Sequence, residues 1–135
     1  MIEKELLEKN NINKVNAKLY SPVTLAYLGD AIYEMFVRTK LVREHNVQVN
    51  KLQRLSIQYV KASAQAQQYR KIEKYLTEEE RKVAKRGKNA KVNTMPKNAA
   101  PVDYMIATGF ETLIGWLYLE EKIDRLAEIV DKAMN

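Results

Sequence analysis

Apolar residues recur at helical spacing along most of the chain, with polar residues between them. The i, i+3, i+4, i+7 pattern is typical of an amphipathic helix, whereas the alternation expected of a half-buried strand is scarce. Glycine and proline, which interrupt helices, number only 4 and 3. The sequence therefore predicts an all-α protein, with helices at 2–9, 21 to about 39, 50–76, 77–87, 104–119 and from about 122.

The helix that begins after Ser21 has a clear start signal and one acid in unusual surroundings. Serine caps the free N–H groups of a first helical turn, and Pro22 suits the first helical position. Asp30 falls off the main apolar stripe of this helix, which consists of Leu25, Leu28, Ile32, Met35 and Phe36. The residues beside Asp30 are also apolar, namely Ala26, Tyr33 and Val37. A carboxylate in such surroundings is costly unless it meets a cation or a metal.

A second acid has a similar setting on the predicted helix 104–119. Glu111 falls off the apolar stripe of that helix, which consists of Ile106, Phe110, Leu113, Ile114 and Leu117. Its own face carries the small residues Ala107, Thr108 and Gly115, which let a second backbone come close. Two carboxylates on two core helices can form an oxygen-ligand metal site. The plainer alternative is that Asp30 is a half-exposed acid at a helix edge, with Gly29 only letting another helix approach.

The middle of the chain is predicted as a long helix, a short helix and a loop. Leu52, Leu55, Tyr59, Ala62 and Ala66 lie at helical spacing within 50–76. Thr77 and Glu80 then form the pattern of a capping box, and Gly87 suits the C-terminal cap of the helix that follows. Residues 85–98 lack apolar periodicity, and their Gly, Asn and Pro predict a loop.

Composition narrows the class of protein. The 135 residues, 46% hydrophobic and 30% charged, fit a single globular domain that buries one core. There is no cysteine and only one histidine, His45, which excludes thiolate zinc sites, disulfides and His-based triads. The N-terminus lacks a signal-peptide apolar run, and no segment is apolar enough to span a bilayer. We therefore expect a cytoplasmic protein with no membrane partner.

The net charge of +6 is concentrated in one segment. Residues 81–102 contain seven basic residues and no acidic one, so they account for the whole net positive charge. A long loop in a small domain is often functional, and a local basic segment favours contact with a polyanion such as RNA or DNA. The alternative is a solvated connection whose lysines only aid solubility.

Two motifs resemble those of the ribonuclease III family. Leu25-Ala26-Tyr27-Leu28-Gly29-Asp30-Ala31 resembles the signature helix of that family, whose pattern is Leu-Glu-Phe-Leu-Gly-Asp-Ala. Phe110-Glu111-Thr112-Leu113-Ile114-Gly115 is similar to its second acidic helix, which reads Asp-x-Phe-Glu-Ala-Leu-x-Gly. The resemblance covers essentially the whole chain in helix order and motif spacing. It implies the ribonuclease III endonuclease-domain helical fold, in a homodimer, with residues 1–135 as a single catalytic domain.

Departures from the family pattern indicate one branch of it. Ala26 stands where the first family glutamate would fall, and Thr108 where its other aspartate would fall. No residues remain after Asn135 for the double-stranded-RNA-binding domain of full-length ribonuclease III. With the basic segment before Pro96-Lys97-Asn98, these departures are similar to the Mini-ribonuclease III branch. That branch implies a magnesium-dependent endoribonuclease that cleaves double-stranded RNA in the maturation of the 23S ribosomal RNA precursor.

The residues fit what the resemblance implies. Only Asp30 and Glu111 are carried over as catalytic residues and metal ligands, since Mg²⁺ binds carboxylate oxygens and keeps several waters. Mn²⁺ is a possible substitute for Mg²⁺. Phosphates and 2′-hydroxyls of duplex RNA are the predicted targets of Lys85, Arg86, Lys88, Asn89, Lys91, Lys97 and Asn98. A two-fold dimer lets one small domain cut both strands.

Two other functions stay open on the sequence. The replacements Ala26 and Thr108 allow a catalytically inactive RNA-binding or scaffold protein of the same fold. A helical protein-interaction module without nucleic-acid function is the other alternative, and it leaves the basic segment unexplained. The presence of both Asp30 and Glu111 favours the enzyme over either alternative.

Overall fold

The computed structural model describes residues 16–17, 20–90 and 100–135. These residues contain helices and no strand, which confirms the all-α prediction. The helix predicted at 2–9 lies outside the described residues. The elements are α2 (Pro22–Glu44), α3 (Val49–Val60), α4 (Ala62–Ile72), the 3₁₀ turn η2 (Glu73–Tyr75), α5 (Glu78–Lys88), α6 (Pro101–Leu119) and α7 (Ile123–Met134).

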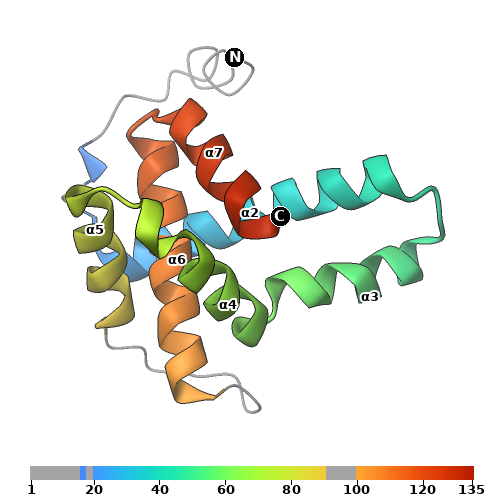
Figure 1. Cartoon of the computed structure of the whole chain (residues 1–135), viewed down its shortest axis with the longest axis horizontal. Coiled ribbons are helices and arrows are strands. Elements are labelled where there is room, and N and C mark those ends of the chain that lie inside the picture. The colour runs from blue at the N-terminus through green and yellow to red at the C-terminus, as the bar shows by residue number, and fades with distance from the viewer. Residues whose placement is uncertain (1–15, 18–19, 91–99) are drawn as a thin grey trace.

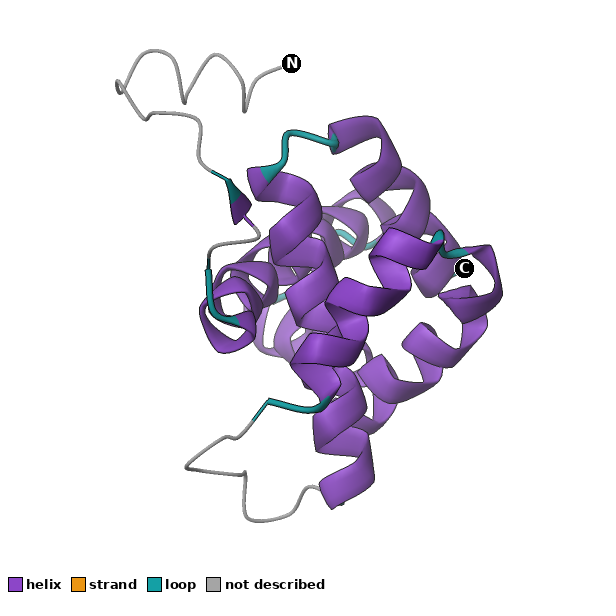
Figure 2. Cartoon of the chain, turned by 90° about the vertical axis from the view of Figure 1, so that its left-hand side faces the viewer, coloured by secondary structure: helices purple, strands orange, loops and turns teal. Residues whose placement is uncertain are grey.

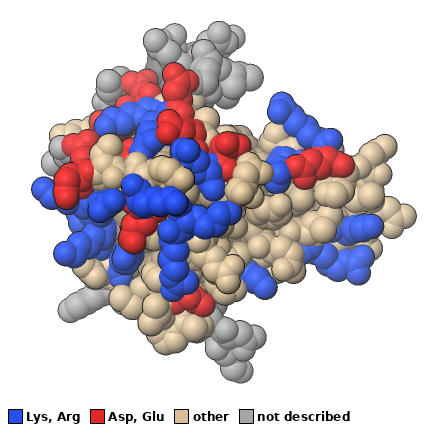
Figure 3. Space-filling view, viewed as in Figure 1, with Lys and Arg blue, Asp and Glu red and all other residues tan. Residues whose placement is uncertain are grey.

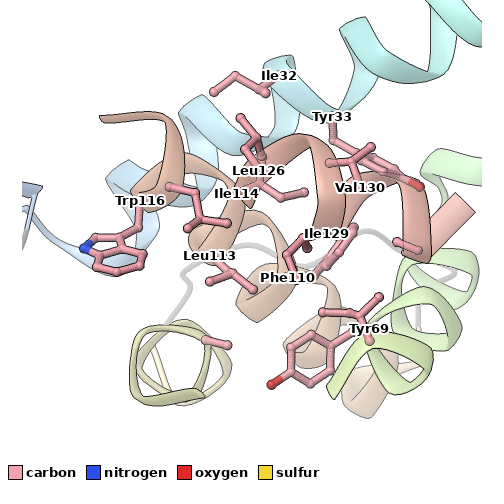
Figure 4. Packing of buried hydrophobic residues seen from close by; sticks show 14 of the residues in the cluster. Ile32, Tyr33, Tyr69, Phe110, Leu113, Ile114, Trp116, Leu126, Ile129 and Val130 are labelled. Carbon is pink, nitrogen blue, oxygen red and sulfur yellow. The ribbon is translucent and has the colours of Figure 1, made fainter. Parts of the chain in front are cut away.

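Helix α6 is at the centre of the protein, with α2, α4 and α5 packed around it (Figures 1 and 2). From Ala107 to Leu117 every residue of α6 except Glu111 is buried. Figure 4 shows Phe110 in the core near Tyr33 of α2, and the two rings meet edge to face with centroids 5.1 Å apart. Helix α7 closes this core with Leu126, Ile129 and Val130. No helix in the described part of the chain is long and apolar enough to cross a membrane.

The core face of α2 is rotated from the predicted apolar stripe. Leu25 and Ile32 are buried as predicted, but Met35 is 58% exposed. Tyr33 and Val37, predicted to lie beside Asp30, are fully buried in the core instead. The rotation of α2 about its own axis is set by its packing on α6. A stripe defined by residue type alone cannot show this rotation.

The second half of α2 and helix α3 form an arm that projects from the rest of the protein (Figure 1). Helix α3 has no fully buried residue. Leu52 and Leu55 are only partly buried where they pack against the core cluster. The arm is therefore held mainly by contacts between α2 and α3.

A break at Lys61 divides the predicted helix 50–76 into α3 and α4, so the prediction of one long helix is wrong. Lys61 has an extended backbone, with φ −65° and ψ 153°. Helix α3 follows α2 along the arm, whereas α4 packs on α6 and buries Ala64, Ala66, Tyr69 and Ile72. One straight helix could not meet both surfaces. Apolar periodicity continues through the break, which is why the sequence does not reveal it.

Helix α5 begins with the predicted capping box. The Thr77 hydroxyl accepts from the Glu80 N–H at 3.1 Å, and the Glu80 carboxylate accepts from the Thr77 N–H at 2.8 Å. The same carboxylate also accepts hydrogen bonds from Arg125 of α7 at 2.8 Å. Glu80 is only 4% exposed. The capping box therefore also ties α5 to α7.

Helix α5 continues past Gly87, so the prediction of Gly87 as its C-terminal cap is wrong. The cap is Asn89. Gly87 instead lies against α6, where an added Cβ would approach the Cα of Gly109 to 2.9 Å. The start of the predicted loop 85–98 is wrong for the same reason, because Lys85, Arg86 and Lys88 belong to the last turns of a helix.

Candidate active site

Two glycines bring α2 and α6 into backbone contact. A Cβ added to Gly29 would overlap the carbonyl oxygen of Glu111 and would approach the nitrogen of Gly115 to 2.9 Å. A Cβ added to Gly115 would in turn overlap the carbonyl oxygen of Leu25. The crossing therefore needs glycine on both helices, because only glycine lacks a Cβ. This confirms the close backbone approach predicted beside Glu111.

The crossing places Asp30 and Glu111 side by side. Their side chains are joined by a hydrogen bond, with Asp30 exposed and Glu111 partly buried. Burial raises the pKa of Glu111 from 4.5 to about 9, and the hydrogen bond and charge of Asp30 act in the same direction. At neutral pH the Glu111 carboxyl group is therefore protonated in the metal-free protein and donates to Asp30.

The pair fits a hard divalent cation. Two carboxylates in contact repel each other unless a proton or a cation lies with them, and a cation such as Mg²⁺ can replace the shared proton. Within the described ranges, no group of three or more His, Cys, Asp or Glu side chains comes together. Asp30 and Glu111 could therefore hold an ion with water and substrate oxygens as the other ligands, a shell that suits Mg²⁺.

The two positions that depart from the family pattern do not add a carboxylate to this site. Ala26 and Thr108 are each 7% exposed. The Thr108 hydroxyl donates to the Tyr104 carbonyl of its own helix at 2.9 Å. The geometry therefore gives a site built on two acids.

Gln65 of α4 lies on the buried side of Glu111. Its amide hydrogen-bonds to the Glu111 carboxylate, which opposes the rise in the pKa of Glu111. Its Nε2 also donates to the Val60 carbonyl at 2.9 Å. Gln65 is missing from the set of site residues predicted from sequence. The available signal was a glutamine between Ala64 and Ala66, on the buried side of a predicted helix.

Part of the predicted RNA-binding set lines a shallow hollow between α5 and the start of α2. Figure 3 shows Lys and Arg gathered on the side of the molecule formed by α4 and α5. Lys82 is not among the residues predicted to bind RNA, although its i+3, i+4 and i+7 spacing to Lys85, Arg86 and Asn89 puts all four on one helix face. The hollow, which we call the α5 hollow, is lined by Pro22, Lys82, Lys85, Arg86 and Asn89.

The rest of the predicted RNA-binding set is not in the α5 hollow. The Lys88 ammonium group lies over the Tyr69 ring, 5.4 Å from its centroid, and so faces α4. The predicted contacts Lys91, Lys97 and Asn98 lie outside the described residues.

The side of α2 away from the core carries exposed apolar side chains on one face. Their exposed fractions are 39% for Val23, 84% for Tyr27, 58% for Met35 and 62% for Val42. We call these four residues the α2 strip. Asp30 lies in line with Val23 on the helical wheel, so the strip runs directly beside the acid pair. The exposed ion pair of Glu34 and Arg38 interrupts this face, so the strip offers separate apolar contacts to an interaction partner.

Comparison with known proteins gives one family. Residues 23–122, which include both acids, match the sequence model of the Ribonuclease III domain. The chain is 51% identical to Mini-ribonuclease 3 of Clostridium tetani over 123 residues, 90% of this chain and 82% of that protein. It is 48% identical to Mini-ribonuclease 3 of Symbiobacterium thermophilum over 112 residues, 83% and 86% of the two chains.

A solved structure shows the same arrangement of helices. The crystal structure of a protein from Fusobacterium nucleatum is 33% identical in sequence and superposes with a TM-score of 0.78. The match covers 86% of this chain and 93% of that one. The helical fold described above is therefore shared by a protein of related sequence.

Proposed function

This chain belongs to the Mini-ribonuclease III branch of the ribonuclease III family and is an endoribonuclease, and we propose that it cleaves double-stranded RNA as a magnesium-dependent homodimer. We further propose, from the family resemblance, that its substrate is a stem of the 23S ribosomal RNA precursor in the cytoplasm. The observation that carries the proposal is the hydrogen-bonded contact between Asp30 and Glu111 at the crossing of α2 and α6.

Asp30 and Glu111 are the residues that would hold the ion, and Mn²⁺ could substitute because the donors are carboxylate oxygens. When bound, Mg²⁺ supplies an acidified water for attack on phosphorus and neutralises charge on the phosphate oxygens. Both carboxylates must be ionised to hold it, so Glu111 releases its shared proton on metal binding. The buried side of Glu111 keeps that carboxylate in place, while the exposed side of Asp30 leaves access for RNA.

The α5 hollow supports the RNA-binding part of the proposal. Duplex RNA is recognised mainly through phosphates, 2′-hydroxyls and the shape of the minor groove. Lys82, Lys85 and Arg86 offer cations for phosphates, and Asn89 offers an amide for a 2′-hydroxyl. Gly87 of the same helix packs against Gly109, which holds α5 on the central helix α6. Lys88, Lys91, Lys97 and Asn98 stay predicted contacts.

The α2 strip supports the homodimer. One catalytic centre cuts one strand, so two centres related by a two-fold axis are the simplest way to cut a duplex. Tyr27 and Met35 present large apolar side chains to such an axis, 84% and 58% exposed in the single chain. Because the strip runs beside Asp30, a second copy bound there would lie at the edge of each active site.

Cleavage of a long duplex RNA, with Mg²⁺ and with EDTA, tests the proposal. We expect cleavage by the wild type only with the metal present. Asp30→Asn and Glu111→Gln should each lower the rate more than about 100-fold. Replacing a residue that only supports a metal ligand already lowers metal affinity or activity about 10–100-fold. The exposed acids Asp124 and Glu128 provide matched controls, and Asp124→Asn and Glu128→Gln should cleave like the wild type.

The same assay separates the proposal from its rivals. A wild-type protein that binds duplex RNA but does not cut it in Mg²⁺ would be the inactive RNA-binding protein. A protein that neither binds nor cuts duplex RNA would match the protein-interaction module. Wild-type turnover by either acid variant would remove that residue from the mechanism.

A further inference from the structure

The buried amide of Gln65 lies between the Val60 carbonyl and the Glu111 carboxyl group. Its Nε2 donates to the Val60 oxygen at 2.9 Å, and the same amide hydrogen-bonds to Glu111. The residue is only 2% exposed, and its Oε1 has no hydrogen-bond partner among the described residues. A buried polar atom without a partner costs about 1–3 kcal/mol, so its presence beside Glu111 calls for a functional reason.

The break between α3 and α4 creates this arrangement. The extended backbone at Lys61 takes the Val60 carbonyl out of the regular helical ladder, and the Gln65 side chain satisfies it. The backbone N–H of Gln65 donates to the Lys61 carbonyl at 3.0 Å. Gln65 is thus anchored to the break through both its backbone and its side chain. This anchoring fixes the orientation of its amide relative to Glu111.

We propose that Gln65 is a positioning residue for the metal site, an inference that rests on the function proposed above. Its Nε2 holds the Glu111 carboxylate in the orientation that meets the ion, and its Oε1 accepts a hydrogen bond from a water of the ion's shell. Mg²⁺ keeps several waters when it binds to proteins, and such a water is a donor for the buried Oε1. Side chains behind metal ligands orient those ligands in this way.

Gln68 provides the matched control, because a purely structural role makes a different prediction. Gln68 lies on the same helix, is 8% exposed and accepts a hydrogen bond from the Tyr33 hydroxyl. Gln65→Met and Gln68→Met each replace a buried amide with an apolar side chain of similar length. Both should lower stability, but only the change at Gln65 should weaken metal binding.

The experiment measures Mg²⁺ binding to the RNA-free proteins by calorimetry, and kcat and KM for duplex RNA. We expect Gln65→Met and Gln65→Leu to weaken Mg²⁺ binding about 10–100-fold, the usual effect of a change behind a metal ligand. At a fixed Mg²⁺ concentration kcat should fall, while the KM for RNA should change little. Gln68→Met should keep the wild-type metal affinity and kcat.

Three outcomes would overturn the inference. They are wild-type Mg²⁺ affinity in a folded Gln65 variant, equal losses of metal affinity in Gln65→Met and Gln68→Met, and failure of both Gln65 variants to fold. The last two would assign Gln65 to the fold alone. All three leave the proposed function intact as long as the wild type binds Mg²⁺ and cleaves duplex RNA. A wild type that does neither would overturn both.

Discussion

Gly29 of α2 lies directly against the backbone carbonyl of Glu111 in α6. An added Cβ would overlap that oxygen and would stand 2.7 Å from the carbonyl carbon. Both atoms belong to the backbone of a buried helix, so they cannot move aside as a flexible side chain can. The contact of these two helices, and with it the pairing of Asp30 and Glu111, therefore depends on the missing side chain at Gly29.

Gly29→Ala should accordingly destabilise the protein by about 3 kcal/mol or more, the upper end of the range for overpacked cores. Because α2 and α6 must separate, Mg²⁺ affinity should fall as well. Urea unfolding and calorimetry would measure the two effects. Gly115→Ala should behave in the same way, since its Cβ would overlap the Leu25 carbonyl oxygen. Ser63→Ala, at an exposed position, is the control and should change stability by less than about 0.5 kcal/mol. A Gly29→Ala protein of wild-type stability would contradict this packing.

The sequence predicted the parts of the site that depend on local pattern. The helices that carry Asp30 and Glu111 follow from their apolar periodicity, and the small residue Gly115 predicted the close approach of a second backbone. The capping box of Thr77 and Glu80 was also predicted, because both of its hydrogen bonds lie within one helical turn.

Features set by tertiary packing could not be predicted in the same way. The break at Lys61 follows from two different packing surfaces for α3 and α4, and no glycine or proline marks it. Gly87 has the residue type of a helix cap but serves a helix contact, which moved the end of α5 from its predicted place. Gln65 meets Glu111 only because the break at Lys61 brings α4 onto α6.

The raised pKa of Glu111 predicts how the stability of the metal-free protein depends on pH. The pKa is about 9 in the folded protein against 4.5 for an ordinary glutamate, so between these values the folded state binds more protons than the unfolded state. The contribution of Glu111 to the free energy of unfolding should be fully present below pH 4.5 and should be lost as the pH rises towards 9. The slope contributed by one proton is at most about 1.4 kcal/mol per pH unit.

Thermal unfolding in EDTA from pH 6 to pH 9 would measure this dependence. Glu111→Gln keeps the shape of the side chain and cannot ionise, so its advantage in stability over the wild type should grow with pH. The exposed glutamate at the start of α5 offers a control, and Glu78→Gln should leave the slope unchanged. Parallel pH profiles for Glu111→Gln and the wild type would show that this group titrates alike in both states.

The α2 strip predicts a homodimer that a single charge can disrupt. A carboxylate at Tyr27 or Met35 would be buried without a partner in a two-fold interface, which is costly. Tyr27→Asp and Met35→Asp should therefore give monomers in sedimentation at micromolar concentration, with little change in the fold by circular dichroism. Tyr75, 46% exposed but on η2, is the matched aromatic control, and Tyr75→Asp should stay dimeric. A wild type that is monomeric both alone and with RNA bound would rule the dimer out.

The α5 hollow predicts a change in the salt dependence of RNA binding. Each phosphate contact releases counterions, so log affinity falls with log salt by roughly 0.9 per contact on duplex DNA, taken here as a guide. Replacing Lys82, Lys85 and Arg86 with alanine should flatten this slope by up to about three units. Because phosphate contacts carry little sequence information, affinity for different duplexes should fall about equally. The titrations are best made in the Glu111→Gln background, where binding is measured without cleavage.

A second triple variant separates local contact from net charge. Arg43, Lys51 and Arg54 are exposed on the arm formed by α2 and α3, and their replacement with alanine removes the same total charge. Long-range attraction alone would make the two triple variants equal, because both lower the net charge by the same amount. Direct contact at the α5 hollow instead predicts a flattened slope for the hollow variant and a nearly wild-type slope for the arm variant. Equal slopes in both would place the RNA contacts elsewhere on the surface, with the exposed Lys61, Lys71 and Lys74 in and beside α4 as the next set to replace.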